Sequence, residues 1–439
     1  MTRLSSIAAL LGTALVCVLG AREAAASGFA IRENSAEALG TAFAGNASSA
    51  TFLSTIFNNP AGMTEFTGDR AQLDSSLILP SARFEGTATQ TCAVCGPLLT
   101  PGTFTTFGEG SGNGGQAAFV PAGYILHSFS DDLKFGFALT VPFGLSTVYP
   151  SDWVGRYFGV RSELQTIDLN PNIAYRVNPW LSVGAGFSAQ YLHADLTNAL
   201  DFTTPLGVLL PDGRARVHGD DWAFGGNVGI LLQPWDSTNI GVTYRSQVDH
   251  TIDGSLDVST FLGSTSTPAK AKLTTPDSVD LSITQKITDK LRIAMDLQWT
   301  HWSVFQDLTV TAAANGAVLS STPEHFRDTW FASVGGTYNW DENWTFRAGV
   351  AFDETPVRDQ YRTVRLPDAN RFWLAFGAGY KFSDGFSIDL GVAHIFMGDG
   401  SLNSSVNNIT AGAFGTVDKI SGKFSNMVDL VSLQTRFKF

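Results

Sequence analysis

The feature that most constrains this chain is a long, repeated alternation of large apolar residues with small or polar ones. From Leu133 to Phe143, an apolar residue occupies every second position, and lysine, glycine, alanine, threonine and proline stand between. The same alternation returns in later segments: 181–191, 291–299, 344–352 and 372–382. Successive side chains of a β-strand point to opposite faces of the sheet. These segments therefore predict strands with one apolar face.

The length of these strands selects a membrane environment. A run of ten to twelve residues exceeds the usual five or six of a globular strand and matches the roughly 9–11 residues of a tilted membrane strand. Only 15% of the 439 residues are charged, and 44 are glycine. After the first residues, no apolar run is long enough for a membrane-spanning helix. The pattern favours an all-β transmembrane barrel whose apolar face meets lipid and whose small, polar face lines the lumen.

Short polar turns recur between the strands, and the segments that separate them can each hold two strands and a long loop. The turns lie at 130–132, 178–179, 236–237, 288–290, 341–343 and 383–385. With an unpaired strand near 70–82 and another near 426–439, the count predicts a closed antiparallel barrel of fourteen strands. Tryptophans beside the turns would form an interfacial girdle: Trp180, Trp235, Trp340 and Trp344.

The beginning of the chain predicts export. Arg3, the apolar run Ile7–Leu19 and the small residues Ala24–Ala26 are typical of a signal peptide over residues 1–26. A barrel of this kind would lie in the outer membrane of a Gram-negative bacterium. Residues 27–69 show no strand alternation and cannot face lipid with unpaired backbone groups. We expect them to form an N-terminal plug, or hatch, of short helical turns inside the lumen, with the barrel over residues 70–439.

Catalysis and nucleic-acid binding are not indicated. The net charge is −12 without a basic stripe, which argues against nucleic acid. Gly110–Gly115 fits G-x-G-x-x-G but lies in a glycine-rich loop, and the histidines form no metal or catalytic motif. We predict no enzyme activity, no cofactor and no metal. Cys92 and Cys95 lack further soft ligands nearby, so we expect a disulfide in an outer loop.

Six ordered motifs carry a resemblance to a known family. They are Ser27-Gly28-Phe29, Asn59-Pro60-Ala61, the segment Asp152–Tyr157, Thr243–Ser246, Asn343–Arg347 and Arg371–Leu374. With these motifs the chain resembles the FadL family of outer-membrane transporters for hydrophobic compounds. The resemblance implies a monomer that takes long-chain fatty acids or aromatic hydrocarbons from the lipopolysaccharide side into an apolar lumenal pocket. It also implies sideways release through a kinked wall strand.

The resemblance also implies candidate site residues. Phe29 and Ile31 of the hatch are expected to contact the ligand, and Asn59, Pro60 and Ala61 match the hatch motif, although an ordinary turn would explain the same residues. Trp153 and Tyr157 lie where exposed aromatic side chains could capture ligand or belong to an outer girdle.

A fatty-acid carboxylate taken out of water needs cations or hydrogen-bond donors. Relatives that carry fatty acids use basic residues in two regions where this chain has Asn198 and Thr322. Arg245 and Arg327 could substitute, or could be lumen and rim charges. The departure leaves room for neutral aromatic hydrocarbons. We expect a lumen with few charges, and the alternative function is a structural or receptor barrel, such as an adhesin or a phage docking surface.

Overall fold

The computed structural model describes residues 27–49, 51–92, 102–106, 108–202, 211–408 and 416–439. The predicted signal peptide, residues 1–26, lies outside the described residues, and so does the expected pairing of the Cys92 and Cys95 side chains. Both expectations stay predictions.

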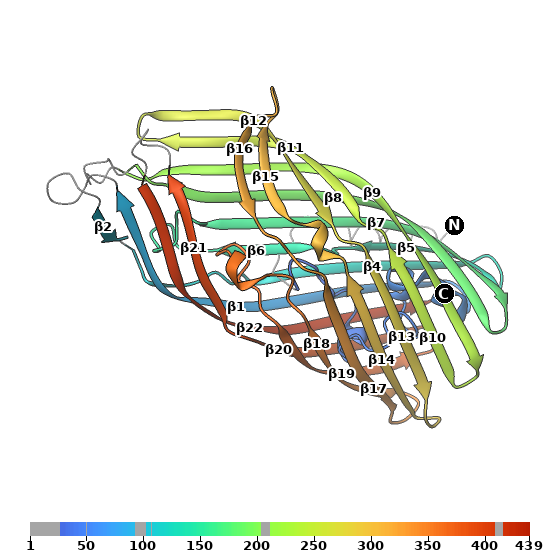
Figure 1. The fold of residues 1–439 in the computed structure, drawn as a ribbon. Helices are drawn as coiled ribbons and strands as arrows, with labels where there is room; N and C mark the ends of the chain where they lie inside the picture. Colours follow the sequence, from blue (N-terminus) through green and yellow to red (C-terminus); the bar gives the residue numbers. More distant parts are fainter. Residues whose placement is uncertain (1–26, 50, 93–101, 107, 203–210, 409–415) are drawn as a thin grey trace.

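The wall is a closed antiparallel β-barrel of fourteen strands, as the alternation and the turns predicted (Figure 1). It closes where the first strand pairs with the last, from Arg70 opposite Lys438 to Thr91 opposite Val417. In order around the barrel, the wall strands are β1 (Arg70–Cys92), β4 (Ala118–Ser128), β5 (Leu133–Thr140) continued by β6 (Gly144–Val148), β7 (Arg161–Asn178), β8 (Leu181–Leu200), β9 (Gly213–Trp235), β10 (Thr238–Arg245), β13 (Ser278–Lys286), β14 (Leu291–Thr300), β17 (Thr329–Asn339), β18 (Trp344–Asp353), β19 (Arg371–Ser383), β20 (Phe386–Met397) and β22 (Thr416–Lys438).

The two ends of the barrel differ in the length of their connections. The six predicted turns join wall strands at one end, at the lower right of Figure 1, and longer segments extend the opposite end. These extensions are β2 (Gly102–Thr105), β3 (Ser111–Asn113), β11 (Val248–Thr260), β12 (Gly263–Thr275), η3 (Trp302–Val304), β15 (Asp307–Ala312), β16 (Val318–Pro323), η4 (Asp359–Tyr361) and β21 (Gly400–Asn408). Short periplasmic turns and long outer loops are typical of outer-membrane barrels.

The alternation points the apolar side chains outward. On β14, Ile293, Met295 and Leu297 are exposed, whereas Asp296 between them is buried. The tryptophans beside the turns are exposed at the same end of the barrel: Trp180, Trp235, Trp340 and Trp344. No helix among the described residues is long and apolar enough to cross a membrane.

One wall strand is interrupted, at a place that the alternation did not predict. The alternation extends to Phe143, but β5 ends at Thr140 and the ladder resumes with β6 at Gly144. Pro142 has no N–H to donate to a sheet ladder, so a break is expected at this point. The neighbouring strand β4 also stops pairing with β5 near the break, and the last pair of that ladder is Gly123 opposite Leu139.

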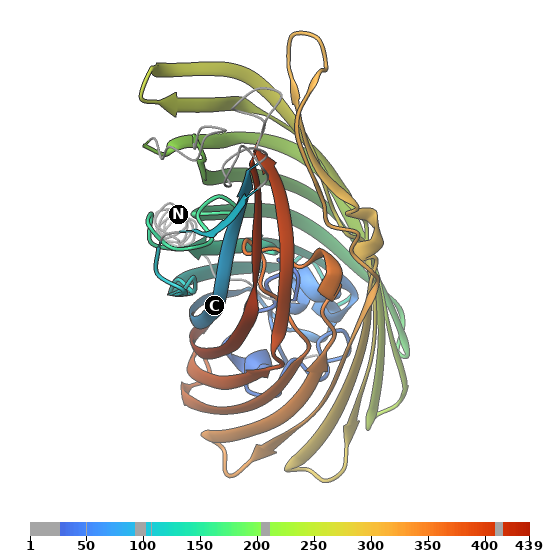
Figure 2. The same ribbon diagram turned by 60° about the vertical axis from the view of Figure 1, so that its left-hand side comes forward.

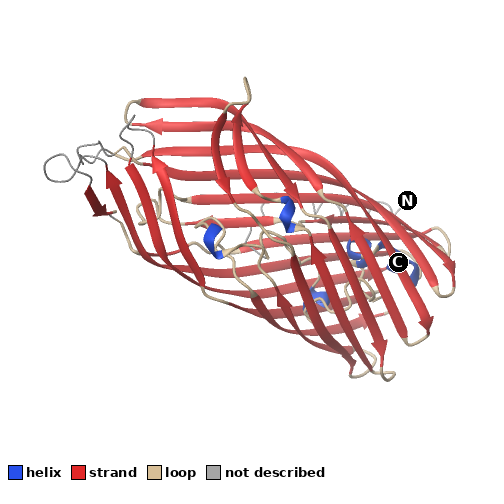
Figure 3. Ribbon diagram, in the orientation of Figure 1, coloured by secondary structure: helices blue, strands red, loops and turns tan. Residues whose placement is uncertain are grey.

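Residues 27–49 and 51–69 lie inside the barrel as a plug of short helical turns, drawn in blue in Figure 2 and with its helices marked in Figure 3. These turns are α2 (Ala36–Leu39), α3 (Thr55–Asn58) and η1 (Pro60–Glu65). Ser35 caps α2 by accepting a hydrogen bond from the Ala38 N–H at 3.3 Å. Below, this plug is called the hatch.

Wall glycines make room for the hatch. A Cβ atom on Gly335 would lie 2.5 Å from the Thr41 carbonyl oxygen, and one on Gly184 would lie 2.6 Å from the Ala61 nitrogen. Several wall glycines therefore serve close packing between wall and hatch backbones.

The expectation of a lumen with few charges is wrong. Buried carboxylate residues lie in the hatch and on the inner face of the wall: Glu33, Glu37, Asp74, Asp168, Asp280, Asp296, Asp353 and Asp389. Buried arginines such as Arg347 and Arg371 accompany them. The hatch fills the lumen with backbone N–H groups and polar side chains, which need partners when water is excluded. The inward face of the alternation supplies those partners.

Candidate ligand-binding site

A cavity lies between Phe29, near the start of the hatch, and the outer extensions, and we call it the apolar cavity. It is bounded by Phe29, by strands β6 to β9 and β11, β12 and β15, and by outer loops. Its apolar lining includes Leu145, Leu164, Ile252, Leu273, Phe305 and Phe326. A lining of this kind suits an apolar or amphiphilic ligand.

Glu324 and Arg365 bring ionisable groups to this apolar lining from two different outer loops. Glu324 is 7% exposed, and burial raises the pKa of its carboxyl to about 8, against the smaller opposing effect of Arg365. Burial lowers the pKa of the Arg365 guanidinium to about 10, although Glu324 opposes this shift. At neutral pH the cavity therefore holds a charged arginine and a mainly protonated glutamic acid.

Hydrogen bonds fix the Arg365 guanidinium against the wall. Nη1 donates to the Arg161 carbonyl oxygen at 3.1 Å and to Ser162 Oγ at 3.0 Å. Nη2 donates to Asn198 Oδ1 at 3.3 Å. Among the described residues, Arg365 forms no ion pair, so its positive charge is available to a ligand in the cavity.

An aromatic cluster separates the apolar cavity from a second one. The Phe29 ring lies 4.6 Å from the Trp302 ring and 5.9 Å from the Phe143 ring, centroid to centroid. Phe29 lines the apolar cavity, while Phe143 and Trp302 line the second cavity, which we call the polar cavity. Arg32 and Asp280 contribute to the lining of the polar cavity. The three rings therefore lie between the two spaces.

The hatch contacts the wall at the interruption between β5 and β6. The Ile31 N–H donates to the Pro142 carbonyl oxygen at 2.8 Å, and the Gly144 N–H donates to the Phe29 carbonyl oxygen at 2.7 Å. Ala30 and Phe143 form an isolated β-bridge between these bonds. The first residues of the hatch thus occupy the place where the wall ladder is broken.

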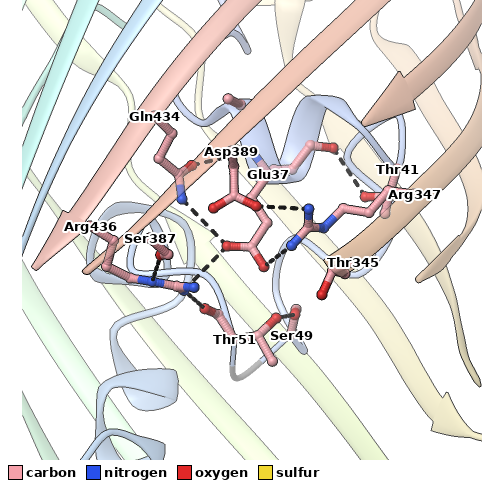
Figure 4. A network of polar contacts seen from close by, with 12 residues as sticks. Glu37, Thr41, Ser49, Thr51, Thr345, Arg347, Ser387, Asp389, Gln434 and Arg436 are labelled. Atoms are coloured by element: carbon pink, nitrogen blue, oxygen red, sulfur yellow. Dashed lines mark hydrogen bonds and ion pairs between the residues drawn. The ribbon is translucent and has the colours of Figure 1, made fainter. Parts of the chain in front are cut away.

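A buried ionic network joins α2 of the hatch to the wall strands β18, β20 and β22 (Figure 4). Glu37 of α2 pairs with Arg347 of β18 at 2.7 Å and with Arg436 of β22 at 3.3 Å. Arg347 also pairs with Asp389 of β20 at 2.9 Å. Arg436 donates further to the Thr51 carbonyl oxygen at 2.8 Å. The two arginines and two carboxylates balance, so α2 is attached to the wall without an uncompensated charge.

Comparison with known proteins decides the family. A family model described as outer membrane protein transport protein (OMPP1/FadL/TodX) matches residues 17–439. The chain belongs to this family. It is therefore an outer-membrane transport protein of a Gram-negative bacterium and not an enzyme.

Individual relatives of this FadL-type chain agree in length and fold. The long-chain fatty acid transport protein of Salmonella typhi is 29% identical over 399 residues, covering 85% of this chain and 88% of the relative. The crystal structure of a Pseudomonas aeruginosa FadL homologue superposes with a TM-score of 0.83 at 26% identity, covering 94% of this chain and all of that one. The Ralstonia pickettii toluene transporter TbuX has a TM-score of 0.64 at 19% identity, over 92% of this chain and 99% of that chain, which shows the fold alone.

The residues predicted to contact ligand in this FadL-type barrel lie in three different places in the structure. Phe29 lines the apolar cavity and Ile31 the polar cavity, and both side chains are buried. Arg245 also lines the polar cavity, where it lies 3.7 Å over the Phe57 ring and donates to the Phe57 carbonyl oxygen. Arg327 lies in a separate outer groove with Arg358. Ligand contact by these residues stays a prediction.

The expected exposure of Trp153 and Tyr157 is wrong. Trp153 is fully buried, stacks on Tyr149 at 4.0 Å between centroids, and donates from Nε1 to the Gly159 carbonyl oxygen. The Tyr157 hydroxyl donates to Asp212 at 2.8 Å. The loop folds back over the end of the barrel because burying these large rings removes apolar surface from water. Neither residue lines the apolar cavity or the polar cavity.

The Asn59-Pro60-Ala61 motif fixes the hatch to the wall. Asn59 caps η1 by accepting from the Ala61 N–H at 3.2 Å, and Pro60 occupies the first turn, where no N–H is needed. Asn59 Nδ2 donates to the Ala47 and Ile230 carbonyl oxygens at 2.7 and 3.0 Å. The gating role expected for the motif stays a prediction.

Sequence reasoning missed Glu324, Arg365, Trp302, Phe305 and Phe326. All of them lie in outer connections without a motif, and only the fold brings them to Phe29. One of the positions that the resemblance singled out is nearby, since Asn198 accepts a hydrogen bond from Arg365.

Proposed function

We propose that this barrel takes up amphiphiles of the long-chain fatty acid type from outside the cell, and that the apolar cavity is their binding site. The observation that carries the proposal is the Arg365 guanidinium, fixed at the lining of a mainly apolar cavity with no ion-pair partner among the described residues. The apolar lining would hold the hydrocarbon tail, and the arginine would hold the carboxylate.

A similarity over most of both chains to a long-chain fatty acid transport protein supports this substrate class. Aromatic hydrocarbons are the second candidate, supported by the many rings around Phe29. A neutral hydrocarbon, however, carries no charge that could pair with the buried arginine. The likeness to a toluene transporter concerns the fold and does not decide between the two substrates.

For release, we propose movement of the hatch and a lateral route through the wall. A buried methylene gains about 0.8 kcal/mol, so a long chain would leave slowly unless the cavity changes shape. The Phe29, Phe143 and Trp302 rings separate the apolar cavity from the polar one, which reaches Pro142 at the wall interruption. The same backbone hydrogen bonds hold Phe29 in place and cover the wall interruption. Displacing the first residues of the hatch would therefore open the passage between the two cavities and also uncover the interruption in the wall.

Binding and release, as proposed, both use residues of one barrel, so we propose that the monomer is the working unit. We also propose that the outer loops meet the lipopolysaccharide layer. The receptor alternative, in which only loop surfaces act, would leave the enclosed cavity and its arginine without a role.

Uptake of radiolabelled oleate and toluene tests the proposal in cells that lack their own uptake protein for each compound. Cells with the wild-type chain should take up oleate faster than vector controls. Arg365→Met should lower oleate uptake about tenfold, since a hydrogen bond to a charged group contributes roughly 1.5–3 kcal/mol. Uptake equal to the vector for both compounds would contradict transport, and faster uptake of toluene alone would favour the aromatic substrate.

A further inference from the structure

Glu324 has an unusual environment for a carboxyl group. Its side chain lines the apolar cavity and is 93% buried, which is the complement of its 7% exposure. Its backbone N–H donates to the Gln306 carbonyl oxygen at 2.8 Å, which fixes the loop. Within the part of the chain that the structure describes, its carboxyl has no hydrogen bond and no ion pair. A buried polar group without a partner is costly and requires an explanation.

The arginine of the same cavity does not supply the missing partner. Arg365 is close enough to influence Glu324 electrostatically, yet no ion pair joins them. Instead the guanidinium donates to Ser162 and Asn198 and to backbone carbonyl groups of the wall. One cavity therefore presents a fixed cation and a separate carboxyl, and the two groups are near enough to influence each other electrostatically.

We infer that Glu324 selects the ligand's head group: its protonated carboxyl donates a hydrogen bond to the carboxylate of a bound fatty-acid-type ligand, while Arg365 balances the charge. The proton stays on Glu324, and the ligand supplies the acceptor that the protein lacks. This inference rests on the proposed function and adds the residue and the protonation state that recognise the head group.

The alternative of an ionised Glu324 does not suit a carboxylate ligand. An ionised Glu324 would repel the ligand and cancel the charge of Arg365. Burial raises the pKa of Glu324 to about 8, so the protonated form dominates at pH 7 and the ionised form at pH 9. Carboxylate binding should therefore be strong at neutral pH and weaken as the pH rises through 8.

Other titratable or charged groups near Glu324 must be distinguished from Glu324 as the source of the pH dependence. They are Asp307 at the start of β15, His325 beside Glu324, Tyr361 against His325, and, at the cavity lining, Glu163, His218 and Lys270. Glu163 pairs with Arg161, Lys270 with Asp253, and His218 with Asp257. His325 bonds to the Gln306 side chain at 3.1 Å.

The test compares two ligands of equal chain length, dodecanoate and 1-dodecanol, by equilibrium binding of radiolabelled ligand to the purified full chain in amphipol between pH 7 and 9. Wild-type affinity for dodecanoate should fall about tenfold over this range, as expected for a group that titrates near pH 8. Affinity for dodecanol should change less than about twofold, since no carboxylate is involved.

Variants assign the effect to Glu324. Glu324→Gln keeps a donor that cannot ionise, so its affinity for dodecanoate should match wild type at pH 7 and stay constant to pH 9. Glu324→Leu removes the donor and should bind dodecanoate about tenfold more weakly at pH 7. The variant Glu342→Gln, at an exposed turn far from the cavity, should keep the wild-type pH profile.

Three results would overturn the inference: a flat wild-type profile, a pH effect that persists in Glu324→Gln, or tighter dodecanoate binding by Glu324→Gln at pH 7. The last would mean that Glu324 is ionised and only neutralises Arg365. Failure of both ligands to bind at any pH would instead overturn the proposed function, so the two failures are distinguishable.

Discussion

Phe29 connects three parts of the molecule through its side chain and its backbone. It closes one side of the apolar cavity, its ring lies 5.7 Å from Phe305 of an outer loop, and its carbonyl oxygen accepts a hydrogen bond from Gly144 of the interrupted wall. Any movement of this residue must change the cavity and the wall contact together. This coupling makes it the residue whose removal is most informative.

Phe29→Ala should weaken dodecanoate binding at pH 7 by about tenfold or more, because burying an aromatic side chain contributes roughly 1.5–3 kcal/mol and 1.4 kcal/mol is a factor of ten. Ligand dissociation should also become faster, since the ring no longer separates the two cavities. Equilibrium and stopped-flow binding to the purified chain measure both effects. Phe352→Ala, which removes an exposed ring from β18, is the control. Unchanged binding by Phe29→Ala would exclude Phe29 from the site.

At the scale of elements, the wall strands were predictable because their signals are local. A strand of alternating apolar residues followed by a turn such as Asp341–Asn343 needs no knowledge of the rest of the chain. The break after Thr140 was harder to predict, because the alternation continues to Phe143 and only Pro142 indicates that the ladder stops. The charged inner face was missed for a different reason: its partners lie in the hatch, far away in sequence.

The glycines of the wall show how such distant elements meet. Gly335 of β17 faces the hatch, and a Cβ there would press on the Thr41 carbonyl oxygen at 2.5 Å. Gly336, the next residue, has only the Arg292 carbonyl oxygen near its position, at 3.7 Å. Sequence alternation separates inward from outward glycines but does not reveal which of them the hatch contacts.

Gly335→Ala should loosen the hatch, since overpacking of a close contact costs roughly 1–3 kcal/mol and the Thr41 backbone must shift. Hydrogen–deuterium exchange of residues 36–48 in the purified protein should become at least several-fold faster. Gly336→Ala should leave this exchange unchanged and serves as a matched control one residue away. Equal protection in both variants would mean that the hatch does not depend on this contact.

At the scale of the whole molecule, the candidate site could not be read from the sequence because it is assembled from segments across the whole chain. The apolar cavity joins Phe29 to residues as distant as Leu366, and the partners of Arg365 are on β7 and β8. The resemblance found Phe29 from a motif, whereas Glu324 and Arg365 carry no motif. Their role follows only from the closed barrel that places them together.

The barrel closes without the hatch, through β1 and β22, whereas the hatch depends on the barrel for its partners. Removing the hatch would admit water to the lumen and hydrate Arg347, Arg436 and Asp389. Removing only the Glu37 carboxylate would leave an excess positive charge in a dry site, which is the costlier change. The whole hatch should therefore be easier to delete than its central charge is to neutralise.

Deletion of residues 27–59 should leave a folded barrel that conducts small polar solutes and has lost selective dodecanoate binding. Heat-modifiable migration on gels and circular dichroism measure folding, and planar-bilayer conductance measures the pore. Full-length Glu37→Gln should keep a low conductance but expose the hatch to protease, because Arg347 loses one of its two carboxylate partners. If the deletion variant kept wild-type conductance and selective binding, the hatch would have no part in closing the pore or in holding the ligand.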